Sequence, residues 1–234
     1  GKLIVLYDDN GITIDGPAGA GKSTIAKLVA GFLGIPYLDT GALYRALALF
    51  LDARGIPPVE SDALFSALQE ASLELTEKEI LLEGKNVGAE IRTPRIDAVV
   101  SAYASLPMVR NRLLDLQREQ GKRNGLVADG RDMATVVFPD ARVKIFLTAS
   151  DEERARRRFL ELRARKESTG YEDVLEQIRE RDRTDSSRST APLRKADDAV
   201  ELSTDGLSIG EVTEKVLNLI REILDKENHY DAVQ

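Results

Sequence analysis

A run of eight residues near the N-terminus has the composition of a phosphate-binding loop. Residues 16–23 read Gly-Pro-Ala-Gly-Ala-Gly-Lys-Ser, which fits the pattern G-x-x-x-x-G-K-[ST]. The apolar run 12–14 precedes this loop and a helical pattern follows it, as a nucleotide-binding loop requires. In such a loop the backbone N–H groups point inward, and the next helix adds its positive end. The predicted loop residues are Gly16, Pro17, Ala18, Gly19, Ala20, Gly21, Lys22, Ser23 and Thr24.

Two side chains of this loop indicate what the bound phosphates would undergo. Lys22 can reach the β- and γ-phosphates of a nucleoside triphosphate, and the Ser23 hydroxyl can ligate a Mg²⁺ that bridges them. A glycine-rich turn that merely packs tightly is the alternative, and the match at every fixed position argues against it. We therefore predict ATP or GTP binding, with Lys22 catalytic, Ser23 a metal ligand and Mg²⁺ the cofactor.

A long arginine-rich stretch is the second feature that could do chemistry. It begins at residues 151–158, Asp-Glu-Glu-Arg-Ala-Arg-Arg-Arg, and continues through Arg181 to Arg188. Phosphoryl transfer concentrates negative charge, which arginines on a closing flap would offset while excluding water. The plainer interpretation is a solvated helical hairpin, and we expect roughly half of these arginines to pair only with acidic neighbours one turn away. Arg154 and Arg163 are the first candidates for that bystander role.

Polar residues also follow two predicted strands, where α/β proteins bind ligands. Asp39 and Thr40 come after one strand, and Arg45 lies one turn into the next helix. Arg131 and Asp132 come directly after another strand. These residues can face a second ligand, although Asp39 could instead be a helix cap.

The elements that must position these residues alternate along the chain. Short apolar runs alternate with stretches of helical periodicity, which is typical of a parallel sheet covered by helices. Predicted strands cover residues 11–15, 36–38, 126–128, 143–147 and 199–202. Predicted helices cover residues 22–33, 42–54, 62–71, 108–120, 151–165, 171–183 and 209–224. Residues 73–90 break this rhythm and predict a small antiparallel meander.

Composition excludes several classes of protein. The 234 residues carry a formal net charge of −7, which argues against a general nucleic-acid binder. There is no cysteine, and the single histidine, His229, lies in a polar C-terminal stretch, so Cys nucleophiles, Cys-rich zinc sites and His-dependent triads are not expected. No apolar run reaches the ~20 residues of a membrane helix, and we expect a soluble cytoplasmic protein.

Taken together, five segments resemble the motif set of bacterial cytidylate kinases. They are DTGALYR at 39–45, EIRT at 90–93, ADGRDM at 128–133, VVFPD at 136–140 and ERDRTD at 180–185. With the phosphate-binding loop they extend the resemblance from about residue 12 to about residue 220. The resemblance implies a P-loop kinase that transfers the γ-phosphate of ATP to CMP or dCMP, acting as a monomer on small molecules and not on nucleic acid or membranes.

The resemblance also assigns roles to individual residues. It implies that Thr40, Tyr44, Arg45 and Arg131 hold the CMP phosphate, near Asp39. Ser101, Arg110 and Asp132 would read the cytosine edge, where an ionised Asp132 accepts from the exocyclic amine and repels the uracil carbonyl. Asp185 would accept from the sugar hydroxyls, with Arg181 and Arg188 beside it. The expected catalytic set is Lys22, Arg131, Arg157 and Arg188.

The expected fold is α/β, of the P-loop NTPase type with three layers. We predict a five-stranded parallel sheet flanked by helices, a small antiparallel β-containing insert that binds the monophosphate, and a helical arginine-rich lid. The predicted single domain spans 11–234, with its core at 11–60, 122–150 and 196–224, its insert at about 61–121 and its lid at about 151–190. Residues 1–10 and 225–234 are predicted tails. Kinases for UMP, dTMP or a small hydroxylated metabolite, and a non-catalytic ATP-dependent switch, remain as alternatives.

Overall fold

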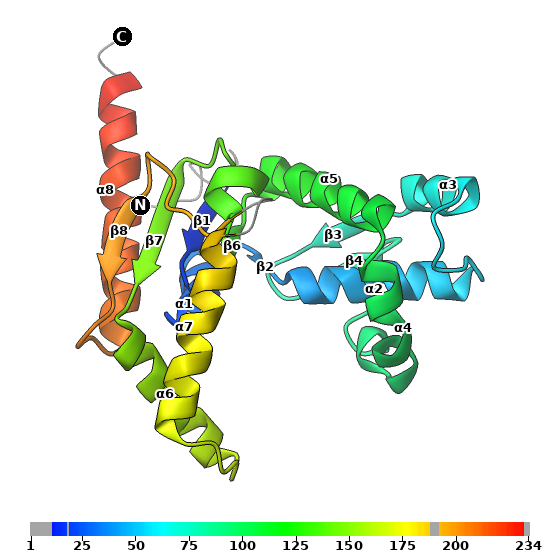
Figure 1. Ribbon diagram of the computed structural model, residues 1–234. Coiled ribbons are helices and arrows are strands. Elements are labelled where there is room, and N and C mark those ends of the chain that lie inside the picture. The colour runs from blue at the N-terminus through cyan, green and yellow to red at the C-terminus, as the bar shows by residue number, and fades with distance from the viewer. Residues whose placement is uncertain (1–10, 18, 188–191, 232–234) are drawn as a thin grey trace.

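The computed structural model describes residues 11–17, 19–187 and 192–231 (Figure 1). Within these residues five parallel strands form the central sheet, in the order β2-β6-β1-β7-β8. The strands are β1 (Ile12–Asp15), β2 (Tyr37–Leu38), β6 (Val127–Gly130), β7 (Val143–Thr148) and β8 (Val200–Ser203). Because they are parallel, their carboxyl ends meet at one edge of the sheet, where ligands of open α/β sheets bind.

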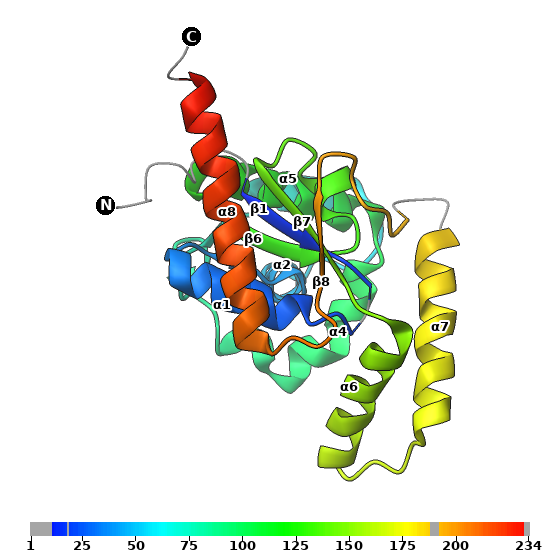
Figure 2. The ribbon, with the colours of Figure 1, turned by 90° about the vertical axis from the view of Figure 1, so that its left-hand side faces the viewer.

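Helices cover both faces of this sheet, and buried aliphatic side chains explain why. One face packs against α1 (Lys22–Leu33) and α8 (Ile209–Asp231), which lie side by side in Figure 2. The other face packs against α2 (Thr40–Ala53) and α5 (Pro107–Asn124). The central strand β1 is buried along its whole length, as expected of a strand covered on both sides.

A group of elements between β2 and β6 extends away from the sheet (Figure 1). The helices that accompany α2 and α5 there are α3 (Asp62–Glu70), the 3₁₀ turn η2 (Glu90–Arg92) and α4 (Pro94–Ala104). The antiparallel sheet there pairs β3 (Leu73–Leu75), β4 (Ile80–Leu82) and β5 (Lys85–Asn86). Their apolar side chains belong to the same core cluster as those of α2, so this region is anchored to the sheet rather than tethered by a linker.

A helical hairpin follows β7 and projects from the carboxyl edge of the sheet (Figures 1 and 2). It consists of α6 (Asp151–Ala164) and α7 (Tyr171–Ser187), which pack together through a small apolar cluster of their own. That cluster contains Ala155, Leu162, Val174, Leu175 and Ile178. The hairpin therefore has internal cohesion that does not depend on the main core.

The predicted five-stranded parallel sheet, the flanking helices and the antiparallel meander are confirmed for the described residues. Several elements differ from the prediction. The 3₁₀ turn η2 was missed, and α5 and α7 each extend four residues beyond their predicted ends. Helix α4 was missed, although Pro94 at its first turn and the apolar spacing of Ile96, Val99 and Tyr103 are helical signals. The π-helical turn η3 (Met133–Val137) was also missed. Helix α8 continues to Asp231 instead of ending at Leu224, since no glycine or proline stops it.

None of the helices within the described ranges combines the length and the apolar character needed to cross a bilayer. The division into core, insert, lid and tails remains a prediction.

Candidate functional site

The loop between β1 and α1 has the backbone shape that its sequence predicts. A Cβ atom at Gly16 would lie 2.3 Å from the carbonyl oxygen of Leu147, so only glycine fits beside β7. Gly21 precedes α1 with a left-handed φ of 85°, which glycine adopts without strain. No side chain among the described residues caps this helix end. The N–H groups of its first turn can therefore serve an anion.

Lys22 lies buried beneath the loop, among charges of both signs. The residue is only 9% exposed to solvent. Burial, together with the nearby cations Arg131 and Arg181, lowers the pKa of Lys22 to about 8, while Asp129 and Asp15 act in the opposite direction. Cations gathered around a buried lysine are the arrangement expected of a site that awaits a strongly negative ligand.

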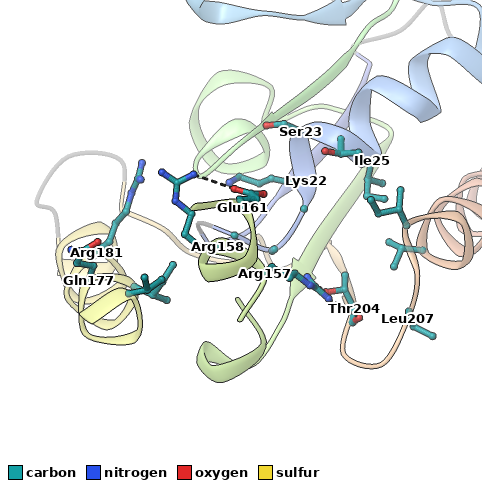
Figure 3. A pocket seen from close by; sticks show the side chains of 18 residues that line it. Lys22, Ser23, Ile25, Arg157, Arg158, Glu161, Gln177, Arg181, Thr204 and Leu207 are labelled. Atoms are coloured by element: carbon teal, nitrogen blue, oxygen red, sulfur yellow. Dashed lines mark hydrogen bonds and ion pairs between the residues drawn. The ribbon is translucent and has the colours of Figure 1, made fainter. Parts of the chain in front are cut away.

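A cavity of about 640 Å³ opens in front of this loop, between α1, the helical hairpin and the segment after β8 (Figure 3). Its volume is in the range of small-ligand sites. Lys22, Arg158 and Arg181 line one part, and Thr204, Leu207 and Ile209 line another. The cavity therefore joins a cationic region to a more apolar one, as a nucleotide with a phosphate tail and a flat base requires.

Ser23 and Tyr37 both donate hydrogen bonds to Asp129, the penultimate residue of β6. The Ser23 hydroxyl lies 2.9 Å from one carboxylate oxygen of Asp129, and the Tyr37 hydroxyl donates to the other. Burial and this hydrogen bond raise the pKa of Tyr37. Asp129 and Tyr37 were missed in the sequence. The signal for Asp129 was an acidic residue at the end of the apolar run 126–128.

Asp15 connects the end of β1 to the segment after β6. Its buried carboxylate accepts hydrogen bonds from the backbone N–H groups of Met133 (2.9 Å) and Ala134 (2.8 Å). Burial is the largest influence and raises the pKa of Asp15 to about 6. Arg131 and Asp132, which precede this anchored turn, are half-buried. The turn that carries Arg131 and Asp132 is thus held against β1, the strand that leads into the phosphate-binding loop.

The beginning of α2 lies beside that turn, because β2 and β6 are neighbours in the sheet. Asp39 caps α2 by accepting from the N–H of Ala42 (3.1 Å), so this part of the alternative interpretation is confirmed. Thr40 accepts from the Gln117 amide at 3.4 Å. Arg45 donates to the carboxylate of Asp97 (2.5 Å) and to a backbone carbonyl of η2. An anion at this position would compete with Asp97 for Arg45.

Similarity to known proteins agrees with this geometry. The sequence model of the family described as "Cytidylate kinase" matches residues 12–222. The chain belongs to the cytidylate kinase family.

Individual members of the family show how extensive the similarity is. The chain is 50% identical over 211 residues to a cytidylate kinase of Fervidobacterium nodosum, which covers 90% of this chain and 96% of that protein. It is 46% identical over 222 residues to a cytidylate kinase of Stutzerimonas stutzeri, covering 92% and 96%. A bifunctional pantoate ligase/cytidylate kinase of Synechococcus elongatus is 50% identical over 220 residues, which is 90% of this chain and 42% of that protein. These relatives do not support the alternatives of another acceptor or a non-catalytic switch.

The residues that the resemblance to cytidylate kinases assigned to the cytosine edge lie on separate elements. Ser101 is on α4 and Arg110 is on α5, and both are exposed. Asp132 comes from the turn after β6. Tyr44, which the resemblance assigned to the CMP phosphate, is partly buried and packs against the core. The fold brings α4 and α5 into contact. Ser101, Arg110 and Asp132 are not among the residues that line the cavity in front of the phosphate-binding loop.

The arginines of the hairpin differ sharply from one another. Arg157 donates to the hydroxyl and carbonyl of Thr204, both at 3.1 Å, and also pairs with Glu153. Arg158 pairs with Glu161 at 3.1 Å at the cavity wall. Arg181 forms no ion pair with any described residue, and Figure 3 shows it extending from α7 beside Arg158. The geometry therefore favours Arg181 over Arg157 as a group available to a bound phosphate.

Three predicted positions cannot be placed in this site. Ala18 and Arg188 lie outside the described residues, and so does the side chain of Asp185. Their assigned roles stay predictions.

Proposed function

We propose that this chain is an ATP:CMP phosphotransferase, which moves the γ-phosphate of ATP to CMP or dCMP and releases ADP with CDP or dCDP. The observation that carries the proposal is the meeting of two sites at one sheet edge. The donor loop follows β1, the acceptor residues follow β2, and β6 lies between these strands with Arg131 and Asp132 at its end. Family membership supports the same acceptor.

The donor nucleotide occupies the cavity in front of the loop. Backbone N–H groups at the beginning of α1 hold its phosphates, and the buried ammonium of Lys22 contacts the β- and γ-phosphates. The base lies toward Leu207 and Ile209, where the cavity wall is apolar. Arg158 exchanges its partner Glu161 for phosphate oxygens as the hairpin closes.

Mg²⁺ fits the oxygen atoms beside the loop. Ser23 offers a hydroxyl and Asp129 a carboxylate, 2.9 Å apart, and hard oxygen ligands of this kind suit Mg²⁺. The described part of the chain contains no cluster of His, Cys, Asp and Glu side chains that could hold a metal alone, which suits an ion bound mainly by phosphate and water. Held by Ser23 and Asp129, Mg²⁺ would offset part of the negative charge of the phosphates.

Transfer proceeds by direct in-line attack of a CMP phosphate oxygen on the γ-phosphorus. No general base is required, because that oxygen is already anionic near neutral pH. Lys22, Arg131 and Arg188, three of the four residues predicted to be catalytic, stabilise the charge that spreads over the moving group. Arg181 takes the place that the prediction gave to Arg157. The oxygen of the broken bond remains with ADP, where Lys22 offsets its developing charge.

The acceptor nucleotide lies over the ends of β2 and β6. Its phosphate displaces Asp97 from Arg45 and contacts Thr40 and Arg131. Asp132 accepts from the cytosine amine, with Ser101 and Arg110 approaching from α4 and α5. Because the side chains of Ser101 and Arg110 are exposed, α4 and α5 close over the base before the three groups can meet it. The same proposal includes the predicted division of the chain into a core, an insert and a lid. It also includes the prediction that the protein acts as a monomer.

A coupled assay of ADP release tests this function. Purified protein is given ATP and Mg²⁺ with CMP, dCMP, UMP, AMP, GMP or dTMP in parallel reactions. We expect turnover mainly with CMP and dCMP. Turnover with another nucleotide would leave the kinase class intact and overturn the assignment of Asp132 and Arg110, and the absence of turnover with every acceptor would refute the proposed activity.

A further inference from the structure

Arg154 is a buried cation in a helix whose other arginines lie nearer the surface. It is 5% exposed, and its guanidinium binds both carboxylate oxygens of Asp182, at 2.8 and 2.6 Å. The Nε atom donates to the backbone carbonyl of Ala149 at 3.0 Å. This residue, which the sequence suggested was a bystander, thus joins the base of α6 to the middle of α7. A planar guanidinium with two parallel bonds fixes both distance and orientation.

The same side chain also packs on the phosphate-binding loop. A Cβ atom at Gly19 would lie 3.2 Å from the Cβ atom of Arg154, so the loop backbone and the stem of this arginine are in close contact. Arg154 consequently touches three parts of the donor site: the loop, the base of the hairpin and α7. A shift of the Arg154 side chain would therefore displace the loop, the base of the hairpin and α7.

Asp182, the partner of Arg154, is the immediate neighbour of Arg181. Arg181 lines the donor cavity and lies close enough to Lys22 to affect it electrostatically. A helix is stiff over adjacent residues, so the ion pair that anchors Asp182 also fixes the backbone position from which the Arg181 side chain extends. The direction of Arg181 toward the phosphate loop is therefore specified one residue away, by an ion pair that does not itself face the cavity.

We propose that Arg154 and Asp182 are a positioning pair that aims Arg181 at the donor phosphates. The inference rests on the proposed kinase function and names a part of its machinery that acts through another residue. Asp182 makes no contact with substrate in this assignment. Its carboxylate holds α7 in register with the loop, and Arg181 makes the contact.

General cohesion of the hairpin does not account for this arrangement. The apolar cluster of Ala155, Leu162 and Val174 already holds α6 against α7. A second ion pair, Arg179 to Asp151 at 2.8 Å, also crosses between the helices. That pair is more exposed, and neither of its residues lines the donor cavity. It is thus a matched control, a bond between the same helices without the neighbouring cavity arginine.

A double-mutant cycle between Asp182 and Arg181 tests the proposal. Asp182→Asn keeps the size of the side chain and removes the charge-assisted pair, whereas Arg181→Met removes the group that is positioned. We expect Arg181→Met to lower kcat about 100-fold and Asp182→Asn about 10-fold. The kcat of the double variant should be no more than about 2-fold below the kcat of the Arg181→Met variant, because no Arg181 side chain remains to be positioned. The KM for CMP should not change with Asp182→Asn.

Additive effects of the two substitutions would overturn the proposal, since Asp182 would then act independently of Arg181. Equal losses of kcat in Asp182→Asn and in the control Asp151→Asn would also overturn it, by showing that any weakening of the hairpin suffices. Arg154→Lys keeps the charge without the bidentate geometry and should resemble Asp182→Asn in kcat. Normal turnover of the unsubstituted protein with CMP establishes the proposed function separately, whichever way the cycle falls.

Discussion

The donor and acceptor sites lie at the same sheet edge but are built in opposite ways. The phosphate-binding loop of the donor site is continuous in sequence, and its shape comes from the backbone: Gly16 fits against Leu147, and Gly21 turns the chain into α1. The acceptor site is assembled from β2, β6, α4 and α5, and depends on side chains. Its predicted members are largely exposed or engaged with other partners, such as Arg45 with Asp97.

This contrast teaches which part of such an enzyme is complete before substrate arrives. A backbone cradle exists once the strand, the loop and the helix have folded, because its N–H groups have no other place to point. A site made of long side chains on separate helices must first bring those helices together. The donor site should therefore respond to substitution by losing chemistry, and the acceptor site by losing discrimination.

The largest effect is expected from the donor side, in Lys22→Met. Loss of this ammonium should lower kcat by at least about 10³-fold, since it removes charge stabilisation that is strongest in the transition state. The fold should be unaffected. Burial lowers the pKa of Lys22 to about 8, which shows that the buried charge costs the folded state free energy that a methionine would not cost. Steady-state kinetics and a thermal melt check both parts. Retained turnover would remove Lys22 from the mechanism.

Asp132→Asn should break discrimination on the acceptor side. We expect kcat/KM for CMP to fall about 100-fold, because a carboxylate that accepts from the cytosine amine is replaced by an amide that can also donate. Relative use of UMP should rise, since the amide can donate to the uracil carbonyl. Parallel assays with CMP and UMP measure this. An unchanged ratio of the two would contradict the assignment of Asp132 to the base.

Tyr37→Phe tests the donor site indirectly, because it removes a hydrogen bond to Asp129, the proposed Mg²⁺ ligand beside Ser23. The phenol holds one oxygen of Asp129 while Ser23 holds the other. Its loss should raise the Mg²⁺ concentration for half-maximal activity about 10-fold, as expected of a group that orients a metal ligand. Calorimetric titration of ADP with and without Mg²⁺ gives a readout independent of turnover. Only the Mg²⁺-dependent part of the affinity should change.

Asp15→Asn addresses the residue that joins the two regions, and its effect should appear in stability. Burial raises the pKa of Asp15 to about 6 from an ordinary 3.8, so the folded protein binds an extra proton between these pH values. The resulting stabilisation is fully present below about pH 4 and is lost as the pH rises through about 6, a difference of about 3 kcal/mol. The free energy of unfolding of the natural protein, relative to the variant, should therefore rise by that amount from about pH 7 to about pH 4. Urea unfolding at several pH values measures it, and parallel pH profiles would contradict the prediction.

The same contrast explains what the sequence could and could not predict. The loop from Gly16 to Thr24 was recognisable because its function depends on consecutive residues, and the parallel sheet followed from alternating apolar runs. Asp129 and Tyr37 were missed because they meet Ser23 only after β2 and β6 have come to lie side by side. Arg154 was misjudged for the same reason, since its acidic neighbours in sequence hid its partner, Asp182, on the next helix.

The position of β6 between β1 and β2 has a consequence for inhibitor design. Strands in a sheet lie about 4.8 Å apart, so the ends of β1 and β2 are separated by roughly 10 Å. Two nucleotides whose phosphates converge across that interval can be replaced by a single ligand, with adenosine at one end, cytidine at the other and a polyphosphate chain between them. Such a molecule would lose its translational freedom only once, and it would bridge the preformed cradle and the side-chain site in a single binding event.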